Sequence, residues 1–249
     1  MSEFSDQIVL ITGAGRGTGR VIALAFGEQD AVVAANDITP INADQTVESI
    51  TTAGGRAKTY LADVAKKMPT QRMISEVLED WGRIDILVNN AGVSPHAEFL
   101  NLDEWDWRRA LDVNLSGPFF TMQSVGRVMR EAGGGVIVNI AADTRQAWSD
   151  QAAFVASKAG LIGLTRQAAQ ELAAYKIRVN AICPQALYPD SGSQGEGRPT
   201  APTPRHLKSQ VANADEVAQQ VLFLCSQAAS HISGQVIDLS ESLDPPVDV

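Results

Sequence analysis

The sequence predicts a single α/β domain built on a doubly wound parallel sheet of about seven strands. Apolar runs of strand type alternate with helix-type segments along all 249 residues, and no linker or internal repeat divides them. The first run, Ile8 to Ile11, stops at a glycine-dense turn that leads into a buried helix. An apolar content of 45% is enough for one sizeable core. We therefore expect residues 1–249 to form one domain.

The glycine-dense turn, from Thr12 to Gly19, has the composition of a phosphate-binding turn. Gly13 and Gly17 have no side chain, so the main chain can fold sharply there and approach a pyrophosphate. Gly19 lets the following helix lie tightly against the strand, and the helix N-terminus presents free N–H groups to the anion. An ordinary turn is the alternative. The position between a strand and a helix favours phosphate binding.

The second strand is expected at 31–37, a continuous apolar run that ends in Asp37. About 20 residues separate this carboxylate from the glycine turn, a spacing at which an acidic side chain accepts hydrogen bonds from both ribose hydroxyls of an adenosine. The same charge repels a 2′-phosphate, so Asp37 favours NAD over NADP. Alternatively, Asp37 only caps the turn at Thr39 and Pro40.

The third strand is expected at 57–61, after a helix over 43–53 that ends at Gly54. Asp63 follows this strand at its carboxyl end. Because the carboxyl ends of parallel strands border the ligand crevice, Asp63 is placed to reach the edge of an adenine ring. Simple turn chemistry explains an aspartate there equally well.

The middle of the chain continues the alternation with longer helices. Asn101 to Glu104 resembles a capping box that opens a helix carrying Asn114. A separate helix is expected over 118–131, because Pro118 suits a first turn and Gly133 suits a stop. The other expected elements are a helix at 67–81, a strand at 84–89, a strand at 136–140, a helix at 151–175, a strand at 178–182, a helix at 213–225 and a strand at 235–239.

One long stretch breaks the alternation. Residues 188–204 are crowded with Gly, Ser and Pro and have no apolar period. A loop of this length inside a compact domain is usually either a functional lid or disordered. Because it follows the carboxyl end of the sixth strand, we expect a substrate lid at about 186–210.

Composition excludes several classes of function. A net charge of −9 and a pI near 4.8 argue against binding to nucleic acid or to an anionic membrane surface. The chain has no apolar run of the ~20 residues that span a bilayer, and its start does not have the pattern of a signal peptide, so we expect a cytoplasmic protein. Cys183 and Cys225 are expected to be buried thiols, and the three histidines match no metal-ligand spacing, so no metal is assigned.

Over essentially the whole chain, these residues resemble the short-chain dehydrogenase/reductase family. The matching motifs are Thr12-Gly13 with Gly17 and Gly19, Asp63-Val64, Asn89-Asn90-Ala91-Gly92, Asn114, Val138-Asn139-Ile140, Ser157-Lys158-Ala159, Arg178-Val179-Asn180-Ala181 with Pro184, and Ser233-Gly234-Gln235. The resemblance implies a Rossmann-type sheet, a nicotinamide dinucleotide, an unknown small-molecule substrate and a homodimer or homotetramer built on the long helices. With the reasoning above, it implies cofactor binding by Gly13, Arg16, Gly17, Thr18, Gly19, Asp37, Asp63, Val64, Asn90, Ala91, Gly92, Lys158 and Pro184.

The resemblance breaks at the catalytic positions. Members that oxidise alcohols or reduce ketones use an Asn, a Ser, a Tyr and a Lys, with the Tyr four residues before the Lys. Asn114 and Lys158 are retained, but Phe154 stands at the Tyr position, and both candidate Ser positions are alanine, Ala141 and Ala142. The phenol moves the hydroxyl proton while hydride is transferred, and each such group typically contributes ~10²–10⁴-fold to the rate. We therefore expect a degenerate catalytic site.

Three functional hypotheses follow, the last of which is a structural protein that binds no cofactor. In the first, the protein binds NAD(H) without the usual alcohol or ketone chemistry and acts as a binding, sensing or partner subunit. In the second, it is a divergent NAD-dependent oxidoreductase whose proton comes from the substrate, from water, or through Asp143 or Tyr188. The enoyl-reductase variant of the family would need a tyrosine at position 151, which is Gln151.

Structural alternatives remain open for the retained residues. Asn114 is either a catalytic group or a helix-interior amide that satisfies nearby backbone. Lys158 is either a cofactor ligand or a solvated surface lysine. His96, Trp148 and Gln185 fall where the family forms its substrate pocket, and packing or loop surface explains each of them as well.

Overall fold

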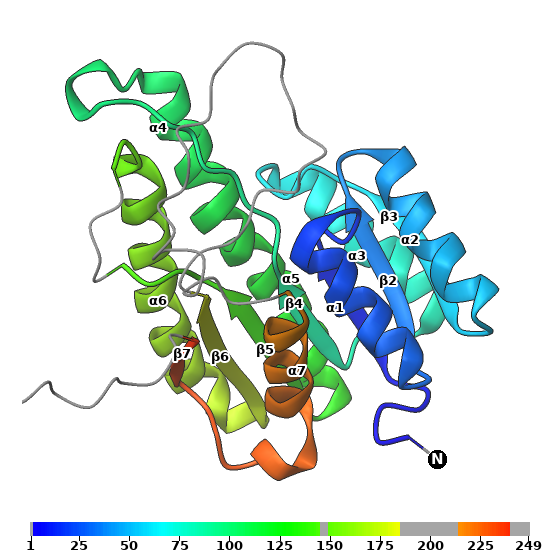
Figure 1. The fold of residues 1–249 in the computed structure, drawn as a ribbon. Helices are drawn as coiled ribbons and strands as arrows, with labels where there is room; N and C mark the ends of the chain where they lie inside the picture. Colours follow the sequence, from blue (N-terminus) through cyan, green and yellow to red (C-terminus); the bar gives the residue numbers. More distant parts are fainter. Residues whose placement is uncertain (1, 145–148, 185–213, 240–249) are drawn as a thin grey trace, which may run out of the picture.

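A computed structural model describes residues 2–144, 149–184 and 214–239. Its seven strands form one parallel sheet in the order β3-β2-β1-β4-β5-β6-β7, as Figure 1 shows. The strands are β1 (Ile8–Thr12), β2 (Val32–Asp37), β3 (Arg56–Leu61), β4 (Ile86–Asn89), β5 (Gly135–Ile140), β6 (Ile177–Pro184) and β7 (Val236–Leu239). The chain winds outward from β1 in one direction and then from β4 in the other. This confirms the expected doubly wound sheet.

Helices cover both faces of the sheet (Figure 1). They are α1 (Gly17–Glu28), α2 (Pro40–Thr52), α3 (Lys67–Trp81), α4 (Glu104–Leu111), α5 (Gly117–Ala132), α6 (Ala152–Leu172) and α7 (Ala214–Cys225), with short helical turns η1 (Phe99–Asn101), η2 (Asp112–Ser116), η3 (Ala173–Tyr175) and η5 (Gln227–Ala229). Phe26 of α1 and Val221 of α7 pack on one face, and Met73 of α3 and Met129 of α5 pack on the other. Strands β1, β2 and β4 are buried throughout, as their continuous apolar runs predict.

The helix expected over 118–131 is present as α5, but no loop separates it from α4. Residues 104–132 form one continuous helical run in which η2, a π-helical segment, joins α4 to α5. Proline has no N–H to donate, and a π turn shifts the hydrogen-bond pairing, so the helix can run through Pro118 without ending. Asn114 therefore lies in the π segment and not in a regular α-helix.

The expected capping box at Asn101 is also wrong. Asn101 ends the turn η1, and the residue that caps α4 is Asp103. The Asp103 carboxylate accepts a hydrogen bond from the backbone N–H of Asp106 at 2.8 Å. Both residue types suit an N-cap position, so composition alone does not separate them.

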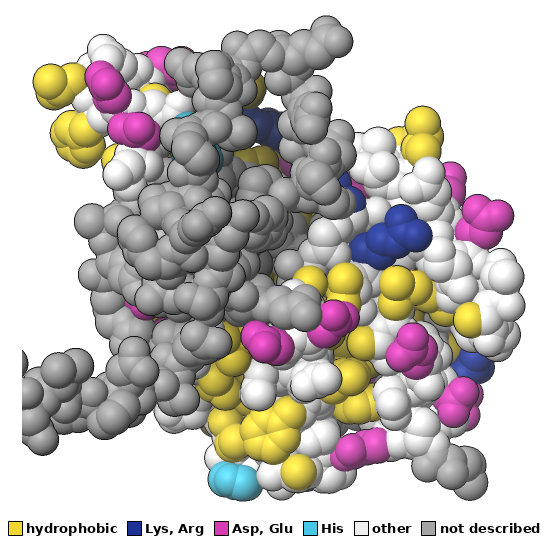
Figure 2. All heavy atoms as spheres, in the orientation of Figure 1, with side chains coloured by type: hydrophobic (Ala, Val, Ile, Leu, Met, Phe, Trp, Pro, Cys, Tyr) yellow, Lys and Arg dark blue, Asp and Glu magenta, His cyan; other side chains and the backbone are white. Residues whose placement is uncertain are grey.

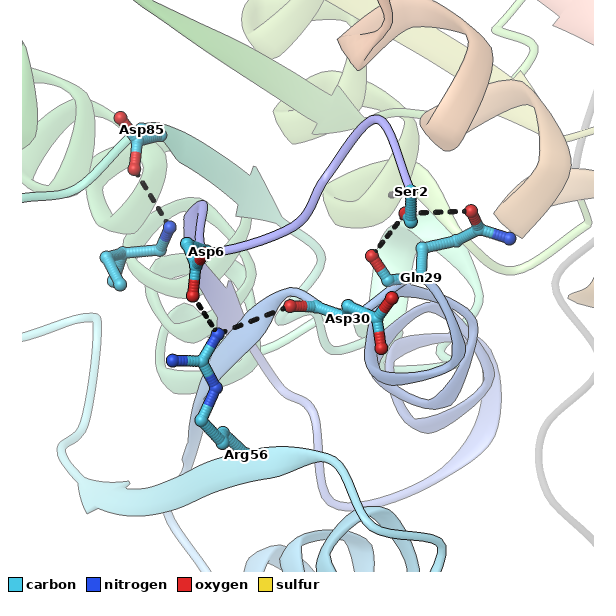
Figure 3. Close-up of polar contacts among 7 residues, drawn as sticks. Ser2, Asp6, Gln29, Asp30, Arg56 and Asp85 are labelled. Atoms are coloured by element: carbon cyan, nitrogen blue, oxygen red, sulfur yellow. Dashed lines mark hydrogen bonds and ion pairs between the residues drawn. The ribbon is translucent and has the colours of Figure 1, made fainter.

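The amino ends of the strands are joined by polar contacts, drawn in Figure 3. Arg56, at the start of β3, forms an ion pair with Asp6 at 2.5 Å and also reaches the carbonyl oxygen of Asp30. Asp85 accepts a hydrogen bond at 2.9 Å from the backbone N–H of Ile8, which ties the start of β4 to β1. These contacts fix this edge of the sheet, and the candidate site residues lie at the opposite, carboxyl edge.

The segment around the start of α4 projects from the body of the molecule at the carboxyl edge (Figure 1). Its large apolar side chains Phe99, Leu100 and Trp105 are exposed, and Figure 2 shows hydrophobic and acidic side chains together at this end. Within the described residues, no helix is both long and apolar enough to cross a membrane.

Candidate functional site

The glycine turn has the geometry of a phosphate cradle. Gly13 and Gly17 adopt φ values of 64° and 53°, which disfavour any residue with a side chain. A Cβ on Gly19 would lie 2.1 Å from the carbonyl oxygen of Gly13, so only glycine allows α1 to pack this closely. The space beside Gly17, in the first turn of α1, is open within 4 Å of where its Cβ would be. The turn therefore leaves room for an anion at a helix N-terminus.

Asn90 braces this cradle from the end of β4. Its side-chain amide donates to the carbonyl oxygens of Thr12 and Gly13 at 3.1 and 3.0 Å. The Thr12 hydroxyl in turn accepts hydrogen bonds from the backbone N–H groups of Asn90 and Ala91 at 3.0 and 3.1 Å. Cα of Ala91 lies 2.9 Å from where a Cβ on Gly13 would be. The segment after β4 thus fixes the shape of the turn.

Two aspartates lie at the carboxyl ends of neighbouring strands, Asp37 as the last residue of β2 and Asp63 just after β3. Asp37 accepts backbone hydrogen bonds from Gly15 at 3.0 Å and from Thr39 at 2.9 Å. The bond to Thr39 is the turn-capping contact that we considered as an alternative role for Asp37. The bond to Gly15 also places the carboxylate against the glycine turn. Asp63 accepts a bond from the backbone N–H of Ala65 at 3.0 Å, which is turn chemistry. A carboxylate has about four acceptor positions, so these bonds leave capacity for ribose hydroxyls.

Lys158 is buried with 2% of its surface exposed, so the surface-lysine alternative is wrong. Its Nζ donates to the carbonyl oxygen of Ile140 at 2.7 Å. Burial lowers the pKa of the Lys158 ammonium from 10.5 to about 8, an effect that the nearby Cys183 partly opposes. The Nζ lies 5.8 Å from the centre of the Phe154 ring, within cation–π range. The aromatic ring thus occupies the position one helical turn before the lysine.

Asn114 pairs with the backbone of Val93. The amide oxygen accepts from the Val93 N–H and the amide nitrogen donates to the Val93 carbonyl oxygen, both at 2.8 Å. The same nitrogen lies 2.9 Å from the Ser157 hydroxyl, which donates to the Phe154 carbonyl oxygen. A fully buried Asn114 therefore does satisfy nearby backbone. In doing so, it ties the segment after β4 to α6, the helix that carries Lys158.

Gly92 brings the retained residues together. A Cβ at this position would lie 3.3 Å from Oδ1 of Asn114 and 3.7 Å from Nζ of Lys158. Gly92 itself is exposed, so it forms the rim of the site above the buried amine. The structure thus places three of the expected site residues, Gly92, Asn114 and Lys158, in one group.

The positions at which the family resemblance would place the catalytic Ser and Tyr are apolar and buried. Phe154, Ala141 and Ala142 are all buried, and Asp143, which directly follows the two alanines, is buried too. Pro184 is buried at the end of β6, where it pairs with Leu239 of β7. The expected lid at 186–210, Tyr188, Gln185 and Trp148 lie outside the described residues.

One hydrogen-bonded group of three polar side chains was not predicted from the sequence. Ser94, His96 and Gln151 form a closed ring of hydrogen bonds between the segment after β4 and the residue before α6. Sequence reasoning considered His96 and Gln151 separately. Because they are 55 positions apart, no local pattern signals their contact.

Cys183 and Cys225 are buried thiols, as predicted. Burial raises the pKa of the Cys225 thiol to about 12, an effect that Arg178 partly opposes. Within the described ranges, no three His, Cys, Asp or Glu side chains gather in a way that would hold a metal ion.

Comparisons with known proteins place this geometry in context. A family model described as enoyl-(acyl carrier protein) reductase matches residues 13–240. The chain is 35% identical to a 3-oxoacyl-(acyl carrier protein) reductase of Thermotoga maritima, over 95% of this chain and 97% of that protein. It is 36% identical to a D-threitol dehydrogenase of Mycolicibacterium smegmatis, over 92% of this chain and 89% of that protein. The structure of an NAD⁺-bound xylitol dehydrogenase matches with a TM-score of 0.87 at 27% identity, over 97% of this chain and 100% of that one.

Proposed function

The chain belongs to the short-chain dehydrogenase/reductase family, and we propose that it binds NAD(H) but does not perform the usual alcohol or ketone chemistry. The observation that carries the proposal is the contrast between two halves of one crevice. The glycine cradle and its brace are complete, whereas Phe154 packs against the lysine that a catalytic tyrosine would accompany. A binding, sensing or partner subunit fits this combination.

The described residues fit a nicotinamide dinucleotide. Gly13, Gly17 and the N-terminus of α1 would hold the pyrophosphate, with Arg16 exposed beside it. Asp37 would accept hydrogen bonds from the adenosine ribose, and its charge favours NAD over NADP. Lys158 would reach the nicotinamide ribose from α6. When bound, the nicotinamide supplies or accepts a hydride.

The remaining cofactor positions follow the same division of the crevice. Asp63 and Val64, which follow β3, would border the adenine. Asn90 and Ala91, which follow β4, would support the glycine turn at the centre of the site. Thr18 lies in the first turn of α1, and Pro184 closes the β6 side. Each of these roles is part of the proposal.

The missing chemistry has a physical cause. Moving a hydroxyl proton needs a donor within hydrogen-bond reach of the substrate oxygen, and neither phenylalanine nor alanine has one. Lys158 keeps its charge-assisted bond to the Ile140 carbonyl, which serves to position the amine. The retained Asn114 is engaged by the Val93 backbone on both its oxygen and its nitrogen.

Titration of the protein with NADH, followed by fluorescence, tests the first half of the proposal. Gly17→Ala would place a methyl group in the open space of the cradle and strain a positive φ, so we expect at least tenfold weaker binding. Gly163→Ala is the matched control, because its methyl group also meets no atom within 4 Å, on α6. Equal affinities for the two variants would argue against the cradle.

Restoring the missing hydroxyls tests the second half. Wild-type protein should bind NADH and turn over none of a panel of alcohols and ketones. The double variant Phe154→Tyr with Ala142→Ser should gain measurable turnover if the scaffold is otherwise competent. Robust wild-type turnover would overturn the proposal.

A divergent NAD-dependent oxidoreductase is the second candidate, and one observation favours it. Asp143 is a buried carboxyl directly after the two alanines at the end of β5, where the family serine would stand. A proton relay would then use Asp143, water, the substrate itself or Tyr188. In this case Asp143→Asn and Lys158→Ala should each reduce turnover by ~10²-fold or more, whereas His231→Asn, far along the chain, should not. Unchanged rates for both variants would exclude this candidate.

A further inference from the structure

The rim of the site is a short loop, residues 92–97, that is attached at both ends. At its inner end, Gly92 lies against Asn114 and Lys158, and the Val93 backbone pairs with the Asn114 amide. At its outer end, the backbone N–H of Ala97 donates to the carbonyl oxygen of Asp150 at 2.9 Å. We call this segment the rim loop.

Three side chains close the outer end of the rim loop, and we call them the clasp: Ser94, His96 and Gln151. The Ser94 hydroxyl donates to Oε1 of Gln151 at 3.1 Å. Nε2 of Gln151 lies 2.9 Å from Nε2 of His96, and Nδ1 of His96 lies 2.9 Å from the Ser94 carbonyl oxygen. With the Gln151 amide donating, Nε2 of His96 accepts and the ring proton lies on Nδ1. Each of the three clasp contacts then pairs one donor with one acceptor.

The clasp joins the rim loop to the helix that carries the buried amine. Gln151 directly precedes α6, and Phe154 and Lys158 follow on its first two turns. The Asn114 pairing secures only the inner end of the rim loop. Loops held by exposed hydrogen bonds open locally at a low free-energy cost, so loss of the outer attachment would leave the rim loop held at its inner end alone.

We propose that Gln151 and His96 are positioning residues that hold the rim loop over Lys158 and keep bulk water from its amine. The proposal goes beyond NAD binding, because it concerns the chain without cofactor and stands if no nucleotide binds. It gives position 151 a structural role in this chain, in place of the acid hydroxyl that the enoyl-reductase variant would carry there. It also accounts for part of the burial of Lys158, because Gly92 of the rim loop lies beside its Nζ.

Acylation of the protein with acetic anhydride across a pH series, with Lys158 quantified by mass spectrometry, tests the proposal. The limiting rate at high pH reports access to the amine, and the midpoint reports its pKa. Wild-type Lys158 should label slowly, with a midpoint at about 8. In Gln151→Leu, the limiting rate should rise about tenfold and the midpoint should move up toward that of an exposed lysine. Gln151 makes no side-chain cap bond to α6, so this change removes the clasp and no helix cap.

His96→Ala is the second variant and should act in the same direction, because it removes two of the clasp bonds. If Gln151→Leu does not fold, His96→Ala decides the question alone. Asn101→Ala is the matched control, since it removes a comparable exposed bond to Glu98 just beyond the rim loop. Wild-type labelling in the clasp variants would overturn the proposal. An equal change in Asn101→Ala would also overturn it, because loosening would then not depend on the clasp.

Discussion

At the scale of single residues, the proposed preference for NAD over NADP rests on Asp37. Its carboxylate lies against the glycine turn through the backbone N–H of Gly15 and accepts a second backbone bond from Thr39. A 2′-phosphate on the adenosine ribose would bring a second negative charge to the same place. Juxtaposed like charges cost several kcal/mol, so this one side chain would be enough to set the proposed selectivity.

Removing that charge gives a direct prediction. In Asp37→Asn, the ratio of NADPH to NADH affinity should rise by roughly tenfold or more, because the repulsion disappears while one oxygen still accepts a backbone bond. Fluorescence titration with both nucleotides measures the ratio. Asp63→Asn is the control, since Asp63 also bonds a backbone N–H in a turn but lies at β3, and it should change both affinities alike. A ratio unchanged by Asp37→Asn would contradict the assignment.

Lys158 makes the stability of the protein depend on pH in a defined direction. Burial lowers the pKa of this ammonium from 10.5 to about 8 in the folded chain. Between these pH values the unfolded chain holds the proton and the folded chain does not, so the contribution of Lys158 to the free energy of unfolding increases as pH rises through this window. The gain is at most about 3 kcal/mol.

Urea unfolding of the cofactor-free protein at several pH values between 7 and 10.5 tests this linkage. Lys158→Met, which keeps much of the volume without the charge, removes the effect. The stability of wild type relative to this variant should therefore increase with pH. A difference that stays constant across the window would show that the lysine is not held in a water-poor environment.

At the scale of elements, two residues, Asp103 and Asn101, were candidates for the N-cap of α4, and mutation distinguishes them. Asp103→Ala should reduce the free energy of unfolding by about 1 kcal/mol, because it removes the acceptor for the Asp106 N–H and an acidic group at the start of α4. Asn101→Ala, two residues earlier, should have a smaller effect, since its bond to Glu98 is exposed and lies outside α4. Equilibrium denaturation measures both. A larger loss of stability in Asn101→Ala than in Asp103→Ala would support the capping box at Asn101 that the sequence suggested.

The strands and the glycine turn were predictable because each depends on residues that are close together in the sequence. A run such as that in β2 is apolar at nearly every position because both faces are covered, and Gly19 is required by one close approach to Gly13. The π segment η2 was not predictable, since a one-residue shift in pairing leaves the apolar spacing almost unchanged. The clasp was not predictable for another reason. Ser94 and Gln151 are far apart in the sequence, and only the fold brings them together.

At the scale of the whole molecule, one surface lies apart from the crevice and is suited to self-association. A groove of about 310 Å³ runs between α5 and α6, lined by apolar residues such as Phe119 and Leu172 together with charged Arg127 and Glu171. Exposed apolar grooves of this kind often mark protein interfaces. Because opposite charges border the groove, a twofold axis could pair Arg127 of one copy with Glu171 of another. The homodimer or homotetramer expected from the sequence would then have an interface at this groove.

Two phenylalanines test this inference, because they are equally exposed on opposite faces of the sheet. Phe119 on α5 is 43% exposed and Phe223 on α7 is 42% exposed. Phe119→Asp would place a charge in the groove, so the mass measured by sedimentation velocity should fall from a multiple of 26.5 kDa toward a single chain. Phe223→Asp adds the same charge at the other face and should leave the wild-type mass unchanged. Dissociation by Phe223→Asp alone would move the interface to α7, and a wild-type protein of single-chain mass would exclude a stable homodimer or homotetramer altogether.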